Sequence, residues 1–202
     1  MKEALVKGIF PTPVYYNSIT RNFTNKELDI VNKYKLEVHQ NAGNSVSINK
    51  FILDNKLKSL KKELIKHINF YFDNVLLAQD VKPCITQSWI NYTQSGQFHH
   101  KHTHPNSLVS GVLYIDADEK NDAIKFHKDK YREIHIQVKE YNFFNSESFI
   151  LPVKTNDLIL FPSNLYHSVQ YKTGSNTRIS LSFNVYVKGI LGNKKELTYL
   201  RV

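Results

Sequence analysis

Hydrophobic residues recur at helical spacing in the first part of the chain. Between Leu57 and Val75, apolar side chains follow one another at intervals of three and four residues, which is the spacing of one helix face. Asp54 precedes this run in a position to cap it. A shorter helix is expected at Thr24-Asn25-Lys26-Glu27, which has the form of a capping box. The pattern predicts two amphipathic helices within residues 1–82.

From Ile85 onward, short runs rich in β-branched and aromatic residues alternate with polar turns. The expected strands are 85–92, 107–116, 123–127, 133–141, 148–153, 158–162, 166–171 and 178–187. Eight short strands behind two amphipathic helices are typical of an antiparallel β-sandwich or barrel with helices against one sheet. We expect one domain over residues 1–202, with helical N-terminal support and a β core at about 83–190.

The last expected strand alternates strictly between polar and apolar residues. Its polar positions share one face, and its apolar positions share the other. The polar positions are Arg178, Ser180, Ser182 and Asn184. Exposure to solvent would explain this face. If the apolar face packs on the helices, however, the polar face lines the interior, where a polar ligand would bind.

Composition and charge narrow the choice of function. The single cysteine, Cys84, excludes an internal disulfide and a Cys-x-x-Cys metal site, which fits a reducing cytoplasm. The N-terminal residues 1–16 contain no uninterrupted apolar run of the kind found in signal peptides, and no run anywhere approaches the ~18 residues needed to span a bilayer, so neither export nor a membrane partner is indicated. The formal charge of +9 and the pI near 9.4 favour an anionic partner. However, the lysines are scattered, and the strands do not interleave lysines with aromatic residues as a nucleic-acid platform would.

Four of the nine histidines lie in the six residues that end at His104. Residues two apart in an extended chain point the same way, so His102 and His104 can present two imidazoles to one metal ion. A third histidine, His167, follows a tight turn, and Arg178 comes eleven residues later. His99 is expected at the rim of the site.

The order of these motifs resembles the 2-oxoglutarate/Fe(II)-dependent oxygenases. Their pattern is His-x-carboxylate, a distant histidine and then a basic residue, often within Arg-x-Ser. The resemblance implies a double-stranded β-helix, a cupin-like jelly roll, that uses Fe(II), 2-oxoglutarate and O2. It also implies that His102, His104 and His167 hold the metal, since imidazole suits Fe(II). Arg178 would then pair with the far carboxylate of 2-oxoglutarate.

One ligand departs from the pattern, because His104 stands where the family has a carboxylate. Three neutral imidazoles leave one more positive charge on the iron than two imidazoles and a carboxylate, which changes its redox tuning and anion affinity. Asp116 and Asp118 are nearby carboxylates, but they lie a strand-length away.

The upstream motifs are similar to the prolyl 4-hydroxylase-like branch. Tyr92 and Tyr114 match its tyrosines before the first ligand and on the following strand, which adds them, with Ser180, to the implied 2-oxoglutarate contacts. Over residues 85–189, the motifs also resemble a group of oxygenases in marine bacteria and cyanophages. The motifs that carry this resemblance are His102-Thr103-His104-Pro105-Asn106-Ser107, Phe161-Pro162-Ser163 and Arg178-Ile179-Ser180.

Within this resemblance, the product is a hydroxylated substrate, released with succinate and CO2 in the cytoplasm of a bacterium or phage-infected host. The substrate is a small molecule or a peptide of unassigned identity, and the oligomeric state is not indicated. Trp89, His99 and Asn184 are the candidate substrate contacts. Trp89 fits a core position as well.

Two other functions remain open. The first is a cupin-type metal protein, because Gly96 followed by His102-x-His104 fits the first cupin motif. However, the glutamate of that motif is missing from this sequence. Arg178 and Ser180 also favour a protein that binds 2-oxoglutarate. A basic nucleic-acid-binding module would use the charge without a metal.

Overall fold

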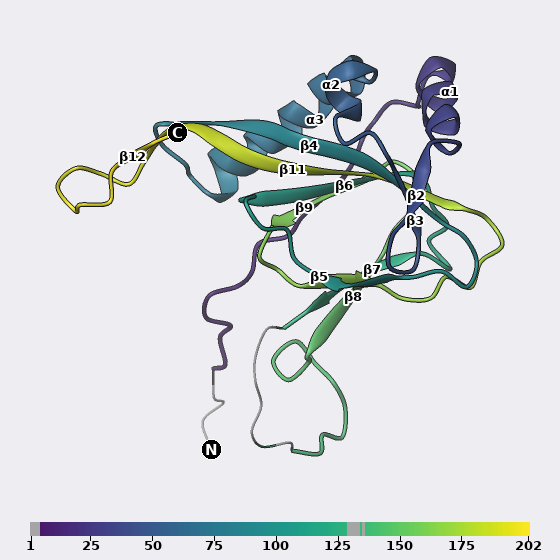
Figure 1. Cartoon of the computed structure of the whole chain (residues 1–202). Coiled ribbons are helices and arrows are strands. Elements are labelled where there is room, and N and C mark those ends of the chain that lie inside the picture. Colours follow the sequence, from purple (N-terminus) through teal and green to yellow (C-terminus); the bar gives the residue numbers. More distant parts are fainter. Residues whose placement is uncertain (1–4, 129–133, 135) are drawn as a thin grey trace.

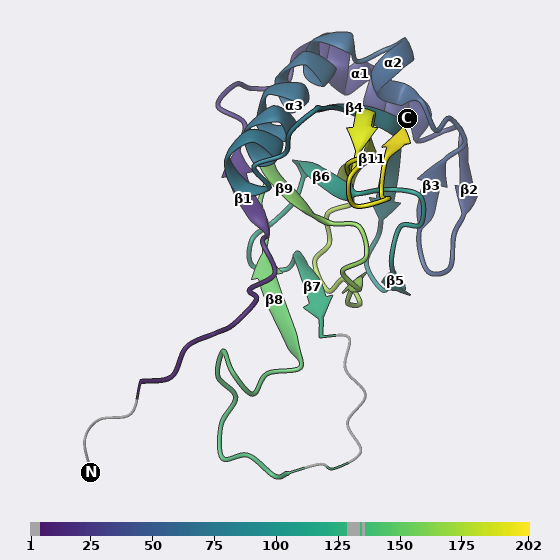
Figure 2. The same cartoon turned by 90° about the vertical axis from the view of Figure 1, so that its left-hand side faces the viewer.

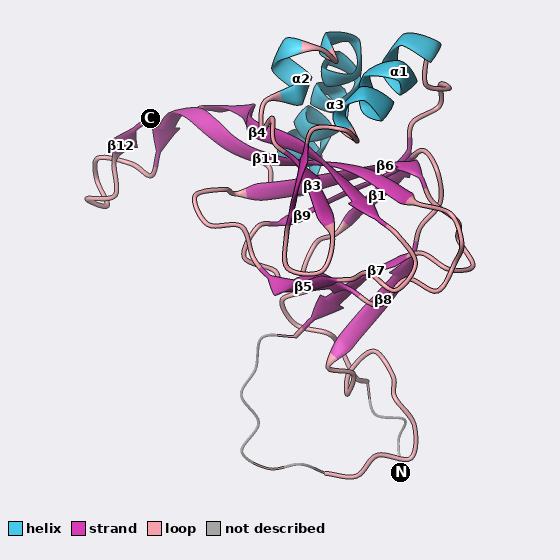
Figure 3. Cartoon of the chain, turned by 45° about the vertical axis from the view of Figure 1, so that its right-hand side comes forward, coloured by secondary structure: helices cyan, strands magenta, loops and turns pink. Residues whose placement is uncertain are grey.

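Two antiparallel sheets face each other, and the helices cover the outer face of the larger one (Figure 1). The computed structural model describes residues 5–128, 134 and 136–202. The large sheet has the order β1-β9-β6-β11-β4-β3-β2, with β12 paired to β11, and the small sheet has the order β5-β10-β7-β8. Figures 2 and 3 show the same layers from two further sides, with all the helices on one side of the sheets. This arrangement confirms the predicted antiparallel β architecture supported by helices on one sheet.

The elements have the following bounds. The strands are β1 Tyr15–Ser18, β2 Val38–Gln40, β3 Ser45–Ser47, β4 Val81–Thr93, β5 His99–His102, β6 Val109–Asp116, β7 Ala123–His127, β8 Ser148–Pro152, β9 Asp157–Pro162, β10 His167–Val169, β11 Arg178–Leu191 and β12 Leu200–Arg201. The helices are α1 Asn25–Tyr34, α2 Ile52–Asn55 and α3 Lys58–Phe70, and α3 continues into a π-helical turn, Tyr71–Val75. Within the described part of the chain, no helix has the length and apolar character needed to cross a membrane.

Of the two predicted helix caps, the structure confirms one and contradicts the other. The capping box of α1 is confirmed: Thr24 Oγ1 accepts from the Glu27 amide at 3.2 Å, and Glu27 Oε2 accepts from the Thr24 amide at 2.9 Å. The prediction that Asp54 caps the second helix is wrong. Asp54 lies within the short α2 and pairs with Lys61, and α3 begins after Leu57 without a side-chain cap. Leu57, at the break between α2 and α3, is buried in the core.

Seven of the eight predicted strands are present, with small shifts at their ends. The exception is 133–141. Its described residues, 134 and 136–141, form no strand, and residues 133 and 135 lie outside the described part. The short strands β1, β2, β3, β5 and β12 were not expected. Three of them lie within residues 1–82, so this region is not only helical but also extends the large sheet at both of its edges.

The alternation in β11 resolves the two interpretations left open by the sequence. Its apolar residues Ile179, Leu181, Phe183 and Val185 belong to the buried cluster that contains the helix residues Leu60, Leu64 and Ile68. The opposite face of β11 therefore points between the two sheets. A second cluster, which includes Val112, Ile124 and Phe161, fills part of that interior.

Gly111 of β6 is required by the packing of Phe183. A Cβ at Gly111 would lie 2.1 Å from Phe183 Cζ, and Phe183 is fully buried. We expect Gly111→Ala to lower the free energy of unfolding by about 1–3 kcal/mol, the usual cost of overpacking, as measured by urea denaturation. Gly8→Ala is the control, because its Cβ would meet only Phe143 at an ordinary 3.5 Å. Equal stability of the two variants would mean that the Phe183 ring has room to move.

Candidate metal centre and cosubstrate pocket

Three histidines, from two neighbouring strands and the turn that follows one of them, converge between the sheets. His102 ends β5, and His167 begins β10 directly opposite it in the antiparallel register. His104 follows two residues later, where its amide donates to Ser163 O at 2.9 Å. One ring nitrogen from each of the three lies within 4.8 Å of the others. The structure thus brings together the three residues that the sequence singled out as metal ligands.

Each of these rings has its Nδ1 engaged by an oxygen. His102 Nδ1 contacts His100 O at 2.7 Å, and His167 Nδ1 contacts Leu165 O at 3.0 Å. A carbonyl oxygen only accepts, so both rings carry their proton on Nδ1. His104 Nδ1 contacts Asn184 Oδ1 at 2.7 Å in the same way. All three Nε2 atoms are consequently left with a free lone pair, the arrangement by which outer hydrogen bonds prepare histidines for a metal.

The spacing of these nitrogens fits a bound cation. His102 Nε2 and His104 Nε2 are 3.1 Å apart. Two nitrogens that each lie about 2.1 Å from one ion, at right angles, are about 3.0 Å apart. Without a cation, two lone pairs at this distance repel each other. Imidazole is also a suitable donor for Fe(II).

Burial keeps the imidazoles neutral. It lowers the pKa of His167 to about 2 and that of His104 to about 4, and it also lowers the pKa of His102. The neighbouring histidines lower these pKa values further, since each disfavours a charge on the next. The rings are therefore unprotonated at Nε2 at neutral pH and need not lose a proton before they bind a metal.

No carboxylate joins this group among the described residues that could hold a metal. Asp116 accepts from Asn176, and Asp118 accepts from Asn121 and from the Lys120 amide, so the neighbouring carboxylates make other contacts. A second histidine group consists of His99, His100 and His102, but His100 is exposed and does not line the cavity that contains the other histidines.

Asn184 holds the ring of His104 in place. Its Oδ1 accepts from His104 Nδ1, and Ser110 Oγ lies 2.9 Å from the same nitrogen. Asn184 is not among the residues that line the cavity described below, and its contact with a substrate stays a prediction. Asn184→Ala is expected to weaken metal affinity about 10–100-fold, the usual effect of losing such an outer contact, in a competition titration against a chelator. The exposed Asn22→Ala is the matched control, and an unchanged affinity in Asn184→Ala would show that Ser110 alone orients the ring.

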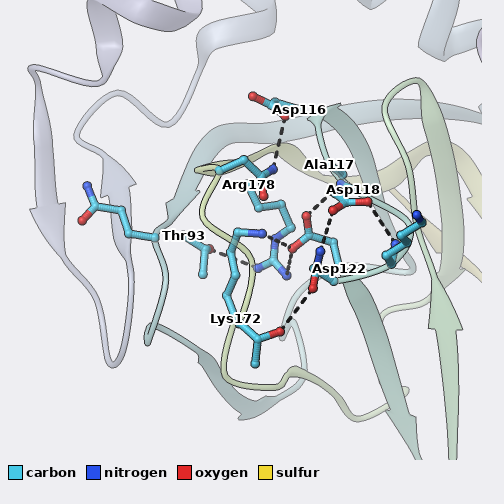
Figure 4. A network of polar contacts seen from close by, with 12 residues as sticks. Thr93, Asp116, Ala117, Asp118, Asp122, Lys172 and Arg178 are labelled. Atoms are coloured by element: carbon cyan, nitrogen blue, oxygen red, sulfur yellow. Dashed lines mark hydrogen bonds and ion pairs between the residues drawn. The ribbon is translucent and has the colours of Figure 1, made fainter.

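A cavity between the sheets connects the histidines with a buried arginine. Its lining includes the three histidines, Tyr114 and Arg178, with Ser180 and Ser182 beside them. Arg178 is 3% exposed, and its Nη2 donates to Thr93 Oγ1 at 3.0 Å (Figure 4). Burial raises the pKa of Tyr114, so its hydroxyl remains a hydrogen-bond donor. The polar face of β11 thus lines the interior, as the alternative based on helix packing predicted.

Of the remaining predicted site residues, some line the cavity and one lies under the helices. Trp89 and His99 line the cavity, and burial lowers the pKa of His99 to about 3. Tyr92 does not line it: its hydroxyl donates to Val31 O at 2.6 Å, beneath the helices. This position corrects the expectation that Tyr92 contacts the cosubstrate. The side chain of the preceding residue, Asn91, points to the opposite face of β4 and lines the cavity.

Asn91 was missed by sequence reasoning. It is 4% exposed and lines the cavity; its Nδ2 donates to Ser182 Oγ at 2.9 Å, and its Oδ1 has no partner in the described structure. The signal was available in the alternation of β4, which places Trp89 and Asn91 on one face and Ile90 and Tyr92 on the other. A buried amide with a free polar atom is suited to contact a bound ligand.

Comparisons with known proteins agree with this site. Residues 87–184 match the model of a family described as "Putative 2OG-Fe(II) oxygenase". A search of curated proteins found no match. A prolyl hydroxylase from Trichoplax adhaerens, solved in complex with a hypoxia inducible factor oxygen degradation domain peptide fragment, has a TM-score of 0.60 at 14% identity, covering 86% of this chain and 83% of that chain.

Two further solved structures share the fold. A 2OG-Fe(II) oxygenase family oxidoreductase from Burkholderia pseudomallei has a TM-score of 0.58 at 12% identity, covering 85% of this chain and 83% of that chain. HygX from Streptomyces hygroscopicus, solved with nickel and 2-oxoglutarate bound, has a TM-score of 0.56 at 8% identity, covering 86% and 82%.

The fold is the jelly roll of these oxygenases, which confirms the predicted fold class. The matched segment contains all three clustered histidines and Arg178, and its model is that of the 2OG-Fe(II) oxygenase family. This is a family of enzymes that use Fe(II), 2-oxoglutarate and O2.

Proposed function

We propose that the chain is a dioxygenase that hydroxylates a small-molecule or peptide substrate and converts 2-oxoglutarate and O2 to succinate and CO2. The observation that carries this proposal is a single cavity with three free imidazole Nε2 atoms and a buried guanidinium in its lining. A chelating ligand with a distal carboxylate matches both groups.

In this proposal, His102, His104 and His167 hold Fe(II), with their Nδ1 contacts fixing the rings. Bound iron supplies the oxidising chemistry, in which one oxygen atom of O2 enters the substrate and the other enters succinate. The protein orients the reactants and excludes water from the cavity. Trp89 and His99, which lie beside the histidines, would contact the substrate.

Arg178 binds the distal carboxylate of 2-oxoglutarate. A guanidinium can meet a carboxylate with two parallel hydrogen bonds, and its attraction is strong in a buried setting. Ser180 and Tyr114 line the same part of the sheet and offer hydroxyl donors. Because the three imidazoles are neutral, the iron keeps its full double positive charge, which favours binding of a dianion.

The first experiment tests cosubstrate binding. 2-Oxoglutarate added to the Fe(II) protein under anaerobic conditions should produce a visible metal-to-ligand charge-transfer band. The spacing of Gly96 and His102-x-His104 favours a second candidate, a cupin-type metal protein without 2-oxoglutarate. Metal binding without this band would support that candidate.

The substrate requires a separate screen. Succinate formation from 2-oxoglutarate should increase when the true substrate is added to the Fe(II) enzyme in air. The screen should include peptides, since the Trichoplax adhaerens neighbour was solved with a peptide, together with amino acids and nucleosides. Stimulation by none of these classes would count against a hydroxylase of small molecules or peptides.

A further inference from the structure

A second charged group lies behind the cavity wall. Lys172, Asp122 and Arg178 are each 3% exposed or less. Lys172 Nζ donates to Asp122 Oδ1 at 2.9 Å, and the same oxygen lies 4.0 Å from Arg178 Nη1 (Figure 4). The other oxygen of Asp122 accepts from the Asp118 amide at 2.9 Å. Asp122 is therefore held closely by Lys172 and only loosely by Arg178.

Lys172 is fixed in this place by its own backbone. Its amide donates to Gln97 O at 2.9 Å, and its carbonyl accepts from the Gly96 amide at 2.8 Å, which ties the loop before β11 to the loop after β4. Neither Lys172 nor Asp122 lines the cavity. Two fully buried ions are costly to desolvate, and a buried ion pair is weak evidence of a stabilising role. A functional reason for the pair is therefore worth seeking.

The charges do not cancel within this group. Two cations, Lys172 and Arg178, face one anion, Asp122, which leaves a net charge of +1 (2 − 1) in a buried region. Without Lys172, Asp122 would be free to close on Arg178 and form a bidentate ion pair. That pair would neutralise the guanidinium that faces the cavity. With Lys172 present, Arg178 is anchored through Thr93 and keeps hydrogen-bond donors for a ligand.

We propose that Lys172 is a positioning residue for the cosubstrate: by holding Asp122, it keeps Arg178 available to the distal carboxylate of 2-oxoglutarate. This inference rests on the proposed function. It assigns a role to a lysine and an aspartate that no sequence motif marked. It also makes the affinity for a dicarboxylate dependent on a residue that does not touch the ligand.

The test measures 2-oxoglutarate binding to the Fe(II) protein without O2, through the fluorescence of Trp89, the only tryptophan, which lines the cavity. Lys172→Met should weaken binding about tenfold or more, a loss of about 1.4 kcal/mol or more. In the double variant Asp122→Asn/Lys172→Met, no carboxylate remains to capture Arg178, so binding should return to within about threefold of wild type. Lys125→Met, on the half-buried Lys125 of β7, is the matched control.

The cosubstrate analogue 2-oxobutyrate separates this role from general damage. It has the same chelating end but no distal carboxylate, so Lys172→Met should leave its affinity unchanged. The inference is overturned if Lys172→Met binds 2-oxoglutarate like wild type, if the double variant is as weak as the single one, or if 2-oxobutyrate binding falls equally.

Folding of the variants is checked by circular dichroism. If Lys172→Met does not fold, the Asp122→Asn variant is measured instead. This variant lacks the competing carboxylate, so it should bind 2-oxoglutarate at least as tightly as the wild type. A tenfold loss of affinity in Asp122→Asn would refute the inference. A wild-type protein that binds Fe(II) but not 2-oxoglutarate would instead refute the proposed function.

Discussion

His167→Ala is expected to abolish Fe(II) binding. The substitution removes one of three converging Nε2 atoms and leaves only His102 and His104, and two imidazoles bind iron far more weakly than three. The measurement is the iron content of the protein after anaerobic loading and desalting, determined with a colorimetric chelator. Because His167 is buried beside Phe161, a thermal melt of the variant is recorded in parallel.

The control for this prediction is His39→Ala, which removes an exposed histidine of β2. It should retain one iron per chain. If His167→Ala also retained one iron per chain, His167 would not be a ligand, and the metal would have to lie elsewhere, with the group at His99 and His100 as the next candidate.

Arg178→Ala is expected to keep iron binding and to lose 2-oxoglutarate binding. Removing one partner of a buried charged contact costs about 2–5 kcal/mol, which corresponds to a dissociation constant raised about 30-fold or more. The guanidinium contacts Thr93 and Asp122 but none of the histidines, so the metal should be unaffected. Anaerobic titration of 2-oxoglutarate into the Fe(II) protein measures the change.

Arg201→Ala is the control, because Arg201 is exposed on β12. The variant should bind 2-oxoglutarate like the wild type. Normal cosubstrate binding by Arg178→Ala would show that another group binds the distal carboxylate, and the cavity-lining Asn91 would be the residue to test next.

Local patterns in the sequence predicted much of the fold. The capping box at Thr24, the helical spacing up to Val75 and the alternation of β11 each involve residues a few positions apart, whose geometry is set by the helix or strand itself. The same local rule applied to β4 would have separated Tyr92 from Asn91. Tyr92 was predicted to contact 2-oxoglutarate because of its position in a motif. The alternation of β4 instead turns its side chain toward the helices.

Contacts between distant residues were not predictable from these patterns. His104 and Asn184 are 80 positions apart, and Asp122 and Lys172 are 50 apart. Which of these side chains meet depends on strand order and register, and shifting a strand by one residue would turn each side chain to the opposite face. The same holds for β5, whose histidine-rich sequence carries no strand signal and which pairs with β10 only in the assembled small sheet.

The sequence by itself determined the candidate ligands, the arginine and the two-faced strand that carries it, because residue types and short spacings encode donor chemistry and side-chain direction. That residues 1–202 form one domain remains a prediction. The tertiary structure decided that the three imidazoles converge with free Nε2 atoms, that Asn184 supports His104, and that Asp122 is shared between Lys172 and Arg178. The physical reason is that these contacts are made between strands, where only the register of the folded sheets brings the side chains within hydrogen-bonding distance.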